Sequence, residues 1–373
     1  MLIALATPVV VLGGCRGFDV RTNNVVRLAE PLAIEPLNIE PLEVRLPPLT
    51  TPLDAVPVGG DPCAAGAIAI IDVDGPLLNR NDPDAVAGEN PVSLFKEKLA
   101  TAASRTDVMA VVLRINSSGG SVLATEVMHR ELVDFKTRTG LPVVACIMDI
   151  GAGGGYYLAT AADRIVTHRS SLVGGVGVIM NLYDVRELMA TLNVFDQRIK
   201  SGKNIDMGTN ADALPEEVES MLQTIADRHH EAFLSVVRSS RGSALVNDRV
   251  LDGRVVDGER AVEVGLVDEA GSLESAIALA GAMGGVTNQS TLAAPMQTST
   301  RGSMLAGPSA RWILFRRGND HAGSPYAVSR QLRLNTGLMP ITLPGVEKQT
   351  VPTFLYMWQP IPHTGVLSSA GDD

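Results

Sequence analysis

The sequence predicts an α/β fold built on a mostly parallel sheet with helices on both faces. In the middle of the chain, short runs that are apolar throughout alternate with longer segments of helical spacing. Uniformly apolar strands are typical of parallel sheets, because crossover helices bury both faces of such sheets. Apolar residues make up 45% of the chain and aromatic residues 4%. The core is therefore expected to consist mainly of Ala, Val, Leu and Ile side chains.

The elements of this core follow one another from residue 67 to about residue 283. Continuous apolar runs predict strands at residues 67–73, 108–115 and 141–148. Helical spacing and start signals predict helices at residues 92–103, 122–136, 151–162 and 214–238. The last of these helices carries Pro215, Glu216 and Glu217 in its first turn, where proline and acidic residues are favoured.

Residues 1–15 carry the pattern of a bacterial lipoprotein signal. An apolar run ends at Gly13, Gly14 and Cys15, and small residues before a cysteine resemble the site where such signals are cleaved and the cysteine is acylated. This pattern predicts an extracytoplasmic protein that begins at Cys15 and is held in the bacterial cell envelope by lipid. Because no Lys or Arg precedes the apolar run, an incidental cysteine is the alternative.

Residues 16–62 are expected to form a proline-rich linker. Three similar five-residue units follow one another at residues 30–34, 35–39 and 40–44, and prolines recur as far as Pro62. Proline at this density is incompatible with helix and sheet interiors, which leaves an extended, polyproline-like chain. Directly after a lipid-anchor motif, such a chain predicts a spacer that lifts a domain off a membrane. A disordered leader without a mechanical role is the alternative.

Charge and cysteine content exclude several classes of function. The net charge of -10 and the lack of a clustered basic face argue against nucleic-acid binding. The three cysteines, Cys15, Cys63 and Cys146, are too few for a disulfide framework and lack the paired spacing of a zinc site. No apolar run reaches the roughly 20 residues that span a bilayer. From the cysteine spacing, and from the lack of any cofactor-binding motif, we expect no metal and no cofactor.

Two glycine-rich strand-to-helix turns form the candidate site. Residues 116–120 and 151–155 offer backbone N–H groups where helices begin, and glycine lets a ligand approach closely. Neither turn has the third glycine of a dinucleotide fingerprint or the lysine of a phosphate loop. Tight packing of helix on strand is the alternative interpretation of each turn taken alone.

An ordered set of short motifs runs from about Ala67 to Ala280. Residues 112–120 are similar to LRINSPGG, residues 156–159 and 162–165 to GGYY(I/L)A and AD(R/K)I, residues 173–178 to TGSIGV, residues 200–202 to KSG, and residues 251–254 and 265–268 to ADGR and GLVD. Together these motifs resemble the signal peptide peptidase A family, also called protease IV, of membrane-associated serine peptidases. The resemblance implies a Clp-protease/crotonase-like core of parallel strands and crossover helices over residues 63–283. It also implies a homo-oligomer, because single-repeat members of the family form rings.

The two catalytic side chains of that family are replaced in this chain. The resemblance implies a Ser nucleophile with a Lys general base, because a hydroxyl needs a neighbour that takes its proton. Alignment on the two tyrosines of the GGYY motif puts Gly153 at the nucleophile position. Alignment on the glycine of KSG puts Ile205 at the base position, and Gly175 replaces the Ser of TGSIGV. These substitutions predict a catalytically inactive homologue.

Backbone groups of the glycine-rich turns remain available to such a homologue. The resemblance implies that Gly119, Gly120 and Gly154 supply the N–H groups of an oxyanion hole. Without the dyad, the same groups are expected to hold extended hydrophobic peptides or membrane proteins by strand addition. The chain is thus predicted to be a peptide-binding or scaffold protein.

An active serine endopeptidase that cleaves signal or membrane-associated peptides is the alternative. It requires relocated groups, and the candidates near the expected site are Ser117, Ser118, Ser201, Lys200 and Lys203. The alternative roles of these residues are hydrogen bonding in turns for the serines and solvated loop charge for the lysines. Crotonase-like acyl chemistry is a further alternative.

Residues 284–373 have no counterpart in the family and are expected to form a partly ordered C-terminal extension. Residues 311–317 and 354–358 are too apolar for a pure linker. They either dock on a partner, a neighbouring subunit or a membrane surface, or pack back onto the chain's own core.

Overall fold

The computed structural model describes residues 52–79, 90–285, 310–318, 322–327 and 354–358. The chain divides into two units, Met1–Pro48 and Leu49–Asp373, and all described residues belong to the second. The predicted signal segment, the lipid anchor at Cys15 and most of the predicted linker lie outside the described residues. Among the described residues, no helix has the length and apolar character needed to cross a membrane.

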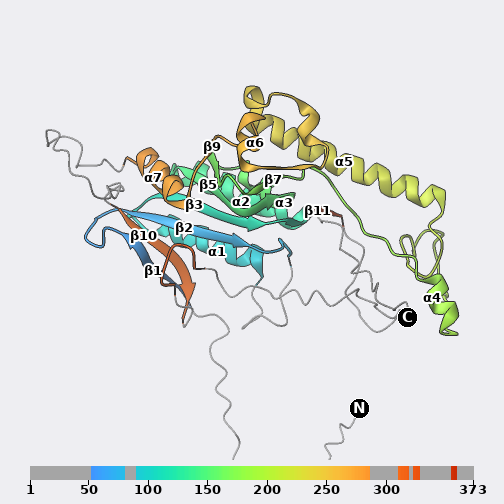
Figure 1. The fold of residues 1–373 in the computed structure, drawn as a ribbon. Coiled ribbons are helices and arrows are strands. Elements are labelled where there is room, and N and C mark those ends of the chain that lie inside the picture. The colour runs from blue at the N-terminus through green and yellow to red at the C-terminus, as the bar shows by residue number, and fades with distance from the viewer. Residues whose placement is uncertain (1–51, 80–89, 286–309, 319–321, 328–353, 359–373) are drawn as a thin grey trace, which may run out of the picture. The chain divides into compact units, whose positions relative to one another are not determined.

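A nine-stranded, mostly parallel sheet forms the centre of the second unit (Figure 1). The strand order is β1-β10-β2-β3-β5-β6-β9, with β7 paired to β5 and β8 paired to β7. The pairs are parallel except β1 with β10 and β7 with β8. The predicted α/β class with a parallel sheet is therefore confirmed. The strands are Leu53–Gly60 (β1), Ala67–Asp74 (β2), Val108–Ser117 (β3), Val143–Ala152 (β5), Arg164–Thr167 (β6), Leu172–Gly174 (β7), Val255–Asp257 (β8), Glu269–Ala270 (β9) and Arg311–Arg317 (β10).

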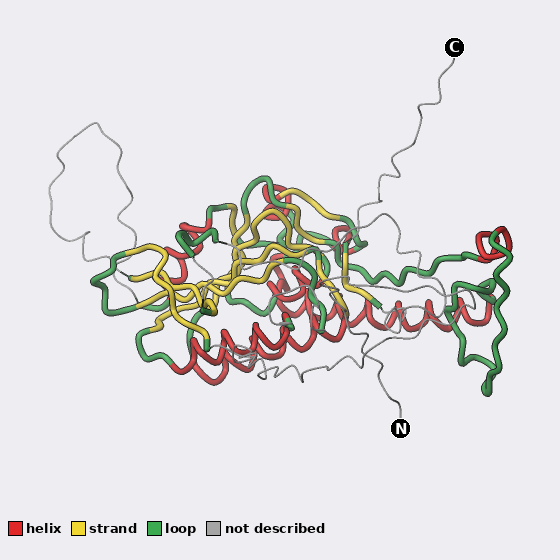
Figure 2. Tube along the Cα trace, turned by 90° about the horizontal axis from the view of Figure 1, so that it is seen from below, coloured by secondary structure: helices red, strands yellow, loops and turns green. Residues whose placement is uncertain are grey.

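Helices connect these strands and cover both faces of the sheet. The long helices start and end close to the predicted positions, since apolar spacing and caps mark them. Asn90, for example, caps the first helix by accepting hydrogen bonds from the N–H groups of Val92 and Ser93. Figures 1 and 2 show α4 near the end at which α5 begins, away from the strands. The helices are Pro91–Ser104 (α1), Val122–Thr139 (α2), Gly154–Ala159 (α3), Arg186–Thr191 (α4), Glu216–Arg241 (α5), Gly258–Glu263 (α6) and Leu273–Met283 (α7), with 3-10 turns at Gly242–Ala244 and Asp248–Leu251.

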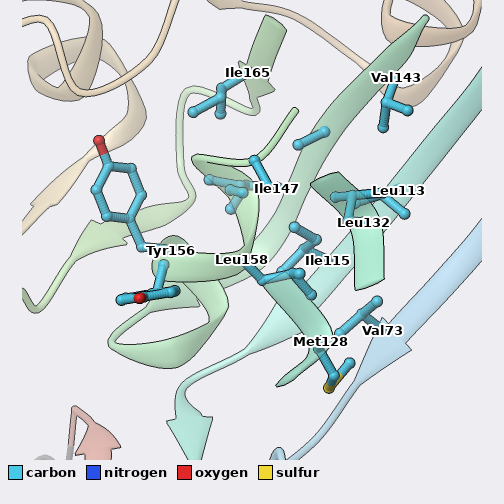
Figure 3. Close-up of a cluster of buried hydrophobic side chains, with 14 of the residues drawn as sticks. Val73, Leu113, Ile115, Met128, Leu132, Val143, Ile147, Tyr156, Leu158 and Ile165 are labelled. Carbon is cyan, nitrogen blue, oxygen red and sulfur yellow. The ribbon is translucent and has the colours of Figure 1, made fainter. Parts of the chain in front are cut away.

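The core lies on the two faces of the sheet, because successive side chains of a strand point to opposite faces. In β2, Ala69 and Ile71 belong to the larger cluster, whereas Ile68 and Ile70 belong to the smaller one. The larger cluster joins the strands to α1, α2, α3 and α5, and Figure 3 shows part of it. The smaller cluster joins the other face to α7. Burial on both faces explains why these strands are apolar throughout.

Both glycine-rich turns are shorter than predicted, because part of each is strand. β3 continues to Ser117, and Gly119–Ser121 forms a further short strand, β4. β5 continues to Ala152, where it pairs with β7, so that α3 begins at Gly154. Strand pairing thus extends into both glycine-rich stretches, where composition alone predicts turn.

The predicted linker over residues 16–62 is wrong at its C-terminal end. Leu53–Gly60 is strand β1, which lies at the edge of the sheet and pairs with β10. An edge strand tolerates proline, because one of its sides needs no ladder hydrogen bonds. The register also shifts between Pro57 and Gly59. Proline content excludes the interior of the sheet but not this edge.

The predicted boundary of the core at Met283 is also wrong, because two strands of the C-terminal extension pack onto the domain. β10 lies inside the sheet between β1 and β2, and the last described strand, Leu355–Met357 (β11), pairs with β4. The described parts of the extension therefore pack back onto the chain's own core. Of the two alternatives for residues 311–317 and 354–358, the structure shows this one.

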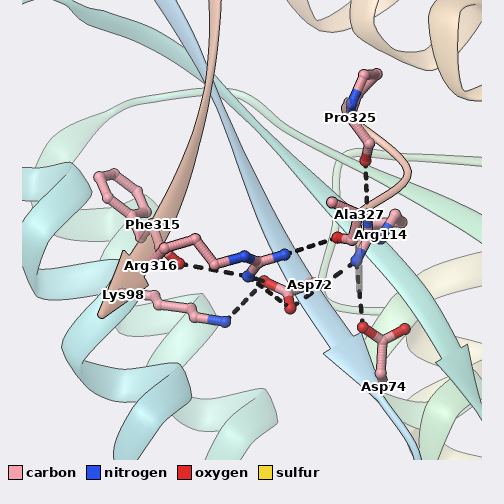
Figure 4. A network of polar contacts seen from close by, with 8 residues as sticks. All are labelled: Asp72, Asp74, Lys98, Arg114, Phe315, Arg316, Pro325 and Ala327. Atoms are coloured by element: carbon pink, nitrogen blue, oxygen red, sulfur yellow. Dashed lines mark hydrogen bonds and ion pairs between the residues drawn. The ribbon is translucent and has the colours of Figure 1, made fainter. Parts of the chain in front are cut away.

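A buried cluster of charges attaches β10 to the core (Figure 4). The carboxylate of Asp72 on β2 accepts hydrogen bonds from Lys98 Nζ of α1 at 2.7 Å and from Arg316 Nη1 of β10 at 3.0 Å. Arg114 of β3 lies 3.9 Å from the same carboxylate and 3.2 Å from that of Asp74. The side chains of Asp72, Lys98, Arg114 and Arg316 are each only 2–3% exposed.

Backbone carbonyls of the C-terminal extension complete this cluster. Arg114 donates to the carbonyl of Pro325 at 2.6 Å, and Arg316 donates to that of Ala327 at 2.6 Å. Burial raises the pKa of Asp74, although Arg114 beside it acts in the opposite direction. A buried charge is tolerated only when hydrogen bonds and opposite charges replace its water. The cluster therefore fixes where the extension meets β2 and β3.

We predict that Asp72→Asn lowers the free energy of unfolding by about 3 kcal/mol or more, because it leaves the buried cations with too little negative charge. Chemical denaturation of the full chain measures this. Glu131→Gln is the matched control, since its partner Lys96 is 64% exposed and the loss should stay below about 1 kcal/mol. Equal losses in the two variants would contradict the role given to Asp72.

Candidate active site

The structure brings the two glycine-rich turns together at the ends of β3, β5 and β7. A Cβ atom added to Gly119 would lie 2.6 Å from the backbone nitrogen of Gly154. A Cβ atom added to Gly175 would lie 3.1 Å from the backbone nitrogen of Gly153. Three segments that are distant in sequence thus meet through their backbones. Glycine is required there because no side chain fits between them.

Gly153 occupies the place expected for a nucleophile but has no side chain. It stands between β5 and α3 with φ 51° and ψ -123°, and its N–H donates to the carbonyl of Gly174 at 3.0 Å. Such a strained strand-to-helix turn is how several hydrolases present a nucleophile. A Cβ atom added here would lie 2.5 Å from the carbonyl oxygen of Tyr356 and 2.8 Å from its carbonyl carbon. The side-chain direction at position 153 therefore points at a polypeptide backbone.

That backbone belongs to β11, which is hydrogen-bonded along both of its edges. On one side, Tyr356 pairs with Gly120 and Met357 pairs with Gly119 of β4, in antiparallel register. On the other side, Leu355 and Ile179 exchange two N–H to carbonyl bonds of 2.9 Å each. β4 and Ile179 thus form the two sides of a groove that holds an extended strand. We refer to this site, with Gly153 at its base, as the β11 groove.

The three predicted oxyanion positions lie close together, but they differ in what they contact. Gly119 and Gly120 face β11, and the N–H of Gly119 also donates to Ser117 Oγ at 3.1 Å. A Cβ atom at Gly154 would instead collide with Thr125 Oγ1 of α2. Gly154 is thus needed for the packing of α3 on α2, a contact between two helices where the alternative interpretation expected helix on strand.

The side chain of Tyr356 fills an aromatic pocket below the groove. Its ring stacks on Tyr157 of α3 at 5.4 Å and lies 4.8 Å from the ring of Phe233 of α5. Its hydroxyl donates to the backbone carbonyl of His229 at 2.9 Å. His129 of α2 packs edge-on against Tyr157 at 5.0 Å. Tyr356 itself is 0% exposed.

The predicted base position lies on an exposed segment. Ile205 lies in the turns that precede α5, and its side chain is 73% exposed. Lys200 pairs with Asp206 at 2.8 Å, and Lys203 pairs with Glu217 at 2.6 Å. These ion pairs hold the segment to itself and to the start of α5.

Of the three relocated serines, Ser117 has a hydrogen-bonded hydroxyl, Ser118 is half-buried and Ser201 is exposed. The buried Ser117 donates its hydroxyl to the carbonyl of Gly75 at 2.6 Å and accepts from the N–H of Gly119. Ser118 contributes its carbonyl to the N–H of Trp358 at 3.0 Å, and Ser201 is exposed on the segment of Ile205. The hydrogen bonds of Ser117 are those of a structural turn residue.

The sequence is similar to a known protein family and to several of its members. Residues 136–287 match the model of peptidase family S49. Protease 4 of Salmonella typhi is 32% identical over 219 residues, which cover 58% of this chain and 34% of that protein. The chloroplastic serine protease SPPA of Arabidopsis thaliana is 30% identical over 216 residues, which cover 57% and 32%. The chain is a relative of the S49 peptidases.

This relationship confirms the resemblance to protease IV that the ordered motifs indicate. The chain spans about a third of the length of these two S49 relatives. Among solved structures, a mutant of the 1510-N membrane-bound stomatin-specific protease in complex with a substrate peptide is similar. It shares 13% identity at a TM-score of 0.35, and the match covers 56% of this chain and 76% of that one.

Sequence reasoning missed the aromatic pocket of this S49 relative. Phe354, Tyr356 and Trp358 alternate at the period of two that marks a strand, and this signal could have been used. His229 and Phe233 stand four residues apart, which places them on one face of a helix. The contact between the strand residues and the helix residues joins positions more than a hundred residues apart, and no local sequence pattern encodes it.

We predict that stability falls in acid partly through the pocket residue His129. Burial lowers its pKa from 6.5 to about 4, and Lys136 adds to the effect. Between these pH values the unfolded chain binds a proton at this residue and the folded chain does not, so stability is lost as pH falls. Between pH 7 and 4.5, His129→Gln should lose about 2 kcal/mol less than the wild type. Denaturation curves at both pH values measure the difference, and parallel losses would contradict it.

Proposed function

We propose that this S49 relative is a catalytically inactive protein that binds extended peptide segments. One observation carries the proposal: the β11 groove holds an extended strand by backbone hydrogen bonds, with the carbonyl group of Tyr356 next to a glycine where a nucleophile would stand. Backbone pairing gives affinity for extended chains of many sequences. Without a nucleophile, the same contacts hold a peptide and do not cleave it.

The engagement of the two candidate lysines elsewhere supports the same proposal. A hydroxyl group attacks a carbonyl only when a neighbouring group accepts its proton. Among the described residues, Lys200 and Lys203 are engaged with carboxylates on the segment before α5. Ser117 already donates its proton to the carbonyl of Gly75. The alternative, an endopeptidase with relocated groups, has no comparable observation in its favour.

We predict that a fluorophosphonate serine probe does not label the folded protein, because position 153 carries no hydroxyl. Gel fluorescence after incubation measures labelling, with an active serine peptidase as positive control and heat-denatured protein as background. Ser117→Ala, Ser118→Ala and Ser201→Ala identify any labelled residue. Labelling that disappears with one of these variants would establish the endopeptidase instead.

The proposal includes a lipid tether in a bacterial cell envelope. It rests on the small residues before Cys15 and on the proline-rich stretch that separates Cys15 from the sheet. Lipidation would place the β11 groove at a distance from the bilayer, within reach of hydrophobic peptides or membrane proteins. These two classes are the partners that we propose.

We predict that Cys15→Ala moves the protein from the membrane fraction to the soluble fraction of the cells that express it, because it removes the acylated thiol. Fractionation and immunoblotting measure the distribution. Cys63→Ala is the matched control, since Cys63 is an exposed cysteine next to the core. Mass spectrometry that finds an unmodified Cys15 in membrane-bound protein would contradict the tether.

Self-association is part of the same proposal. Large apolar side chains are exposed on the segment between β7 and α5, where Phe195 is 74% exposed and Ile205 is 73% exposed. Exposed apolar side chains that gather on one segment are typical of surfaces that bind another protein. They give the homo-oligomer, which the family resemblance implies, a surface on which to form.

A further inference from the structure

The β11 groove selects one side chain far more than the others. Tyr356 is fully buried in the aromatic pocket, whereas its neighbours Leu355 and Met357 are half-buried. The rings of Tyr157 and Phe233 contact it from two different helices. Along the bound strand, the side-chain contacts are thus concentrated at one position.

The end of this pocket recognises a hydroxyl group. The carbonyl of His229 accepts a hydrogen bond from the Tyr356 hydroxyl at 2.9 Å. His229 lies in the middle of α5, and a helical carbonyl has a second lone pair beyond the one used by the helix. Removing a partner from a buried polar group usually costs about 1–3 kcal/mol. The pocket therefore favours tyrosine over phenylalanine as well as over smaller side chains.

The position of this pocket relative to Gly153 is fixed by the backbone. A Cβ atom at Gly153 would lie 2.8 Å from the carbonyl carbon of Tyr356 and 3.0 Å from the Cα atom of Met357. The peptide bond that faces position 153 is thus the one that follows the tyrosine. The aromatic pocket binds the side chain of the residue on the N-terminal side of that bond.

We infer that the β11 groove is selective for an extended segment with a tyrosine whose carbonyl faces Gly153, and that residues 354–358 are the chain's own occupant, which an outside segment must displace. The inference rests on the proposed peptide-binding function and adds to it the ligand class and the competitor.

Competition within one chain determines how tightly an outside peptide binds. An outside peptide replaces the backbone hydrogen bonds of β11 with equal ones, so side chains and effective concentration decide the exchange. A tethered segment acts at an effective concentration of roughly millimolar. The apparent Kd of an outside peptide equals its intrinsic Kd divided by the fraction of molecules in which the groove is empty. Weakening the resident strand should therefore tighten the binding of the outside peptide.

Fluorescence anisotropy with a labelled peptide that copies residues 354–358 tests the competition on the full chain. Tyr356→Ala removes the buried ring of the resident strand, and we expect the peptide's Kd to fall at least tenfold relative to the wild type. Tyr326→Ala is the matched control, because Tyr326 is 43% exposed and bonds to Glu274 instead. Equal Kd values for the wild type and Tyr356→Ala would overturn the resident-occupant part of the inference.

Selectivity is tested by two altered peptides on the Tyr356→Ala chain. Replacing the peptide's tyrosine by phenylalanine should raise Kd about fivefold or more, and replacing it by alanine should raise Kd at least fiftyfold. If the alanine peptide binds as tightly as the tyrosine peptide, the selectivity is wrong while the peptide-binding function stands. If none of these peptides and no other apolar peptide binds to either chain, the proposed function itself fails.

Hydrogen–deuterium exchange gives a second measurement on the wild-type chain, which needs no substitution that affects folding. At saturating tyrosine peptide, amides of residues 354–358 should exchange at least tenfold faster. The amides of Ile179 and Val122, which bond to this segment in the free protein, should stay protected by the new strand. Residues 354–358 that remain protected at saturation would overturn displacement.

Discussion

One buried carboxylate, that of Asp72, determines how the C-terminal extension joins the core. Lys98 and Arg316 both bond to it and Arg114 lies beside it, so an α-helix and two neighbouring strands of β2 converge on one anion. None of these side chains has access to water, and each is stable only in this arrangement. The register of β10 against β2 is thereby fixed by charge as well as by backbone pairing.

The shape of the β11 groove depends on this core and not on catalytic side chains. Gly119 meets Gly154 and Gly175 meets Gly153 through backbone atoms, at the ends of strands whose apolar residues fill both faces of the sheet. These contacts do not depend on the side chain at position 153, because they are formed by backbone atoms. The S49 relationship and the glycine at position 153 are therefore compatible, because pairing with a strand uses only backbone groups.

The sequence predicts the central strands and long helices to within a few residues, because their apolar periodicity is local information. It does not predict β1 and β10, whose pairing joins residues 53–60 to residues 311–317 across the whole domain. Proline content argued against a strand at Pro57, but an edge position accepts it. Motif order points to Gly153, which stands between β5 and α3, and to Ile205, whose exposed segment is held by its own ion pairs. The order of sequence motifs indicates where a residue lies in space only when packed strands or helices flank that residue on both sides.

An empty β11 groove would leave the edge of β4 unpaired. Such an edge is open to pairing with any extended chain, which is a hazard that folded proteins avoid by covering it. In this chain β11 covers the edge, and Tyr356 anchors the cover in a pocket built by α3 and α5. Because an incoming strand restores every backbone bond that β11 gives up, those bonds cannot favour one occupant over the other. The choice is left to the aromatic pocket, so one side chain decides whether the groove holds the chain's own strand or a partner's.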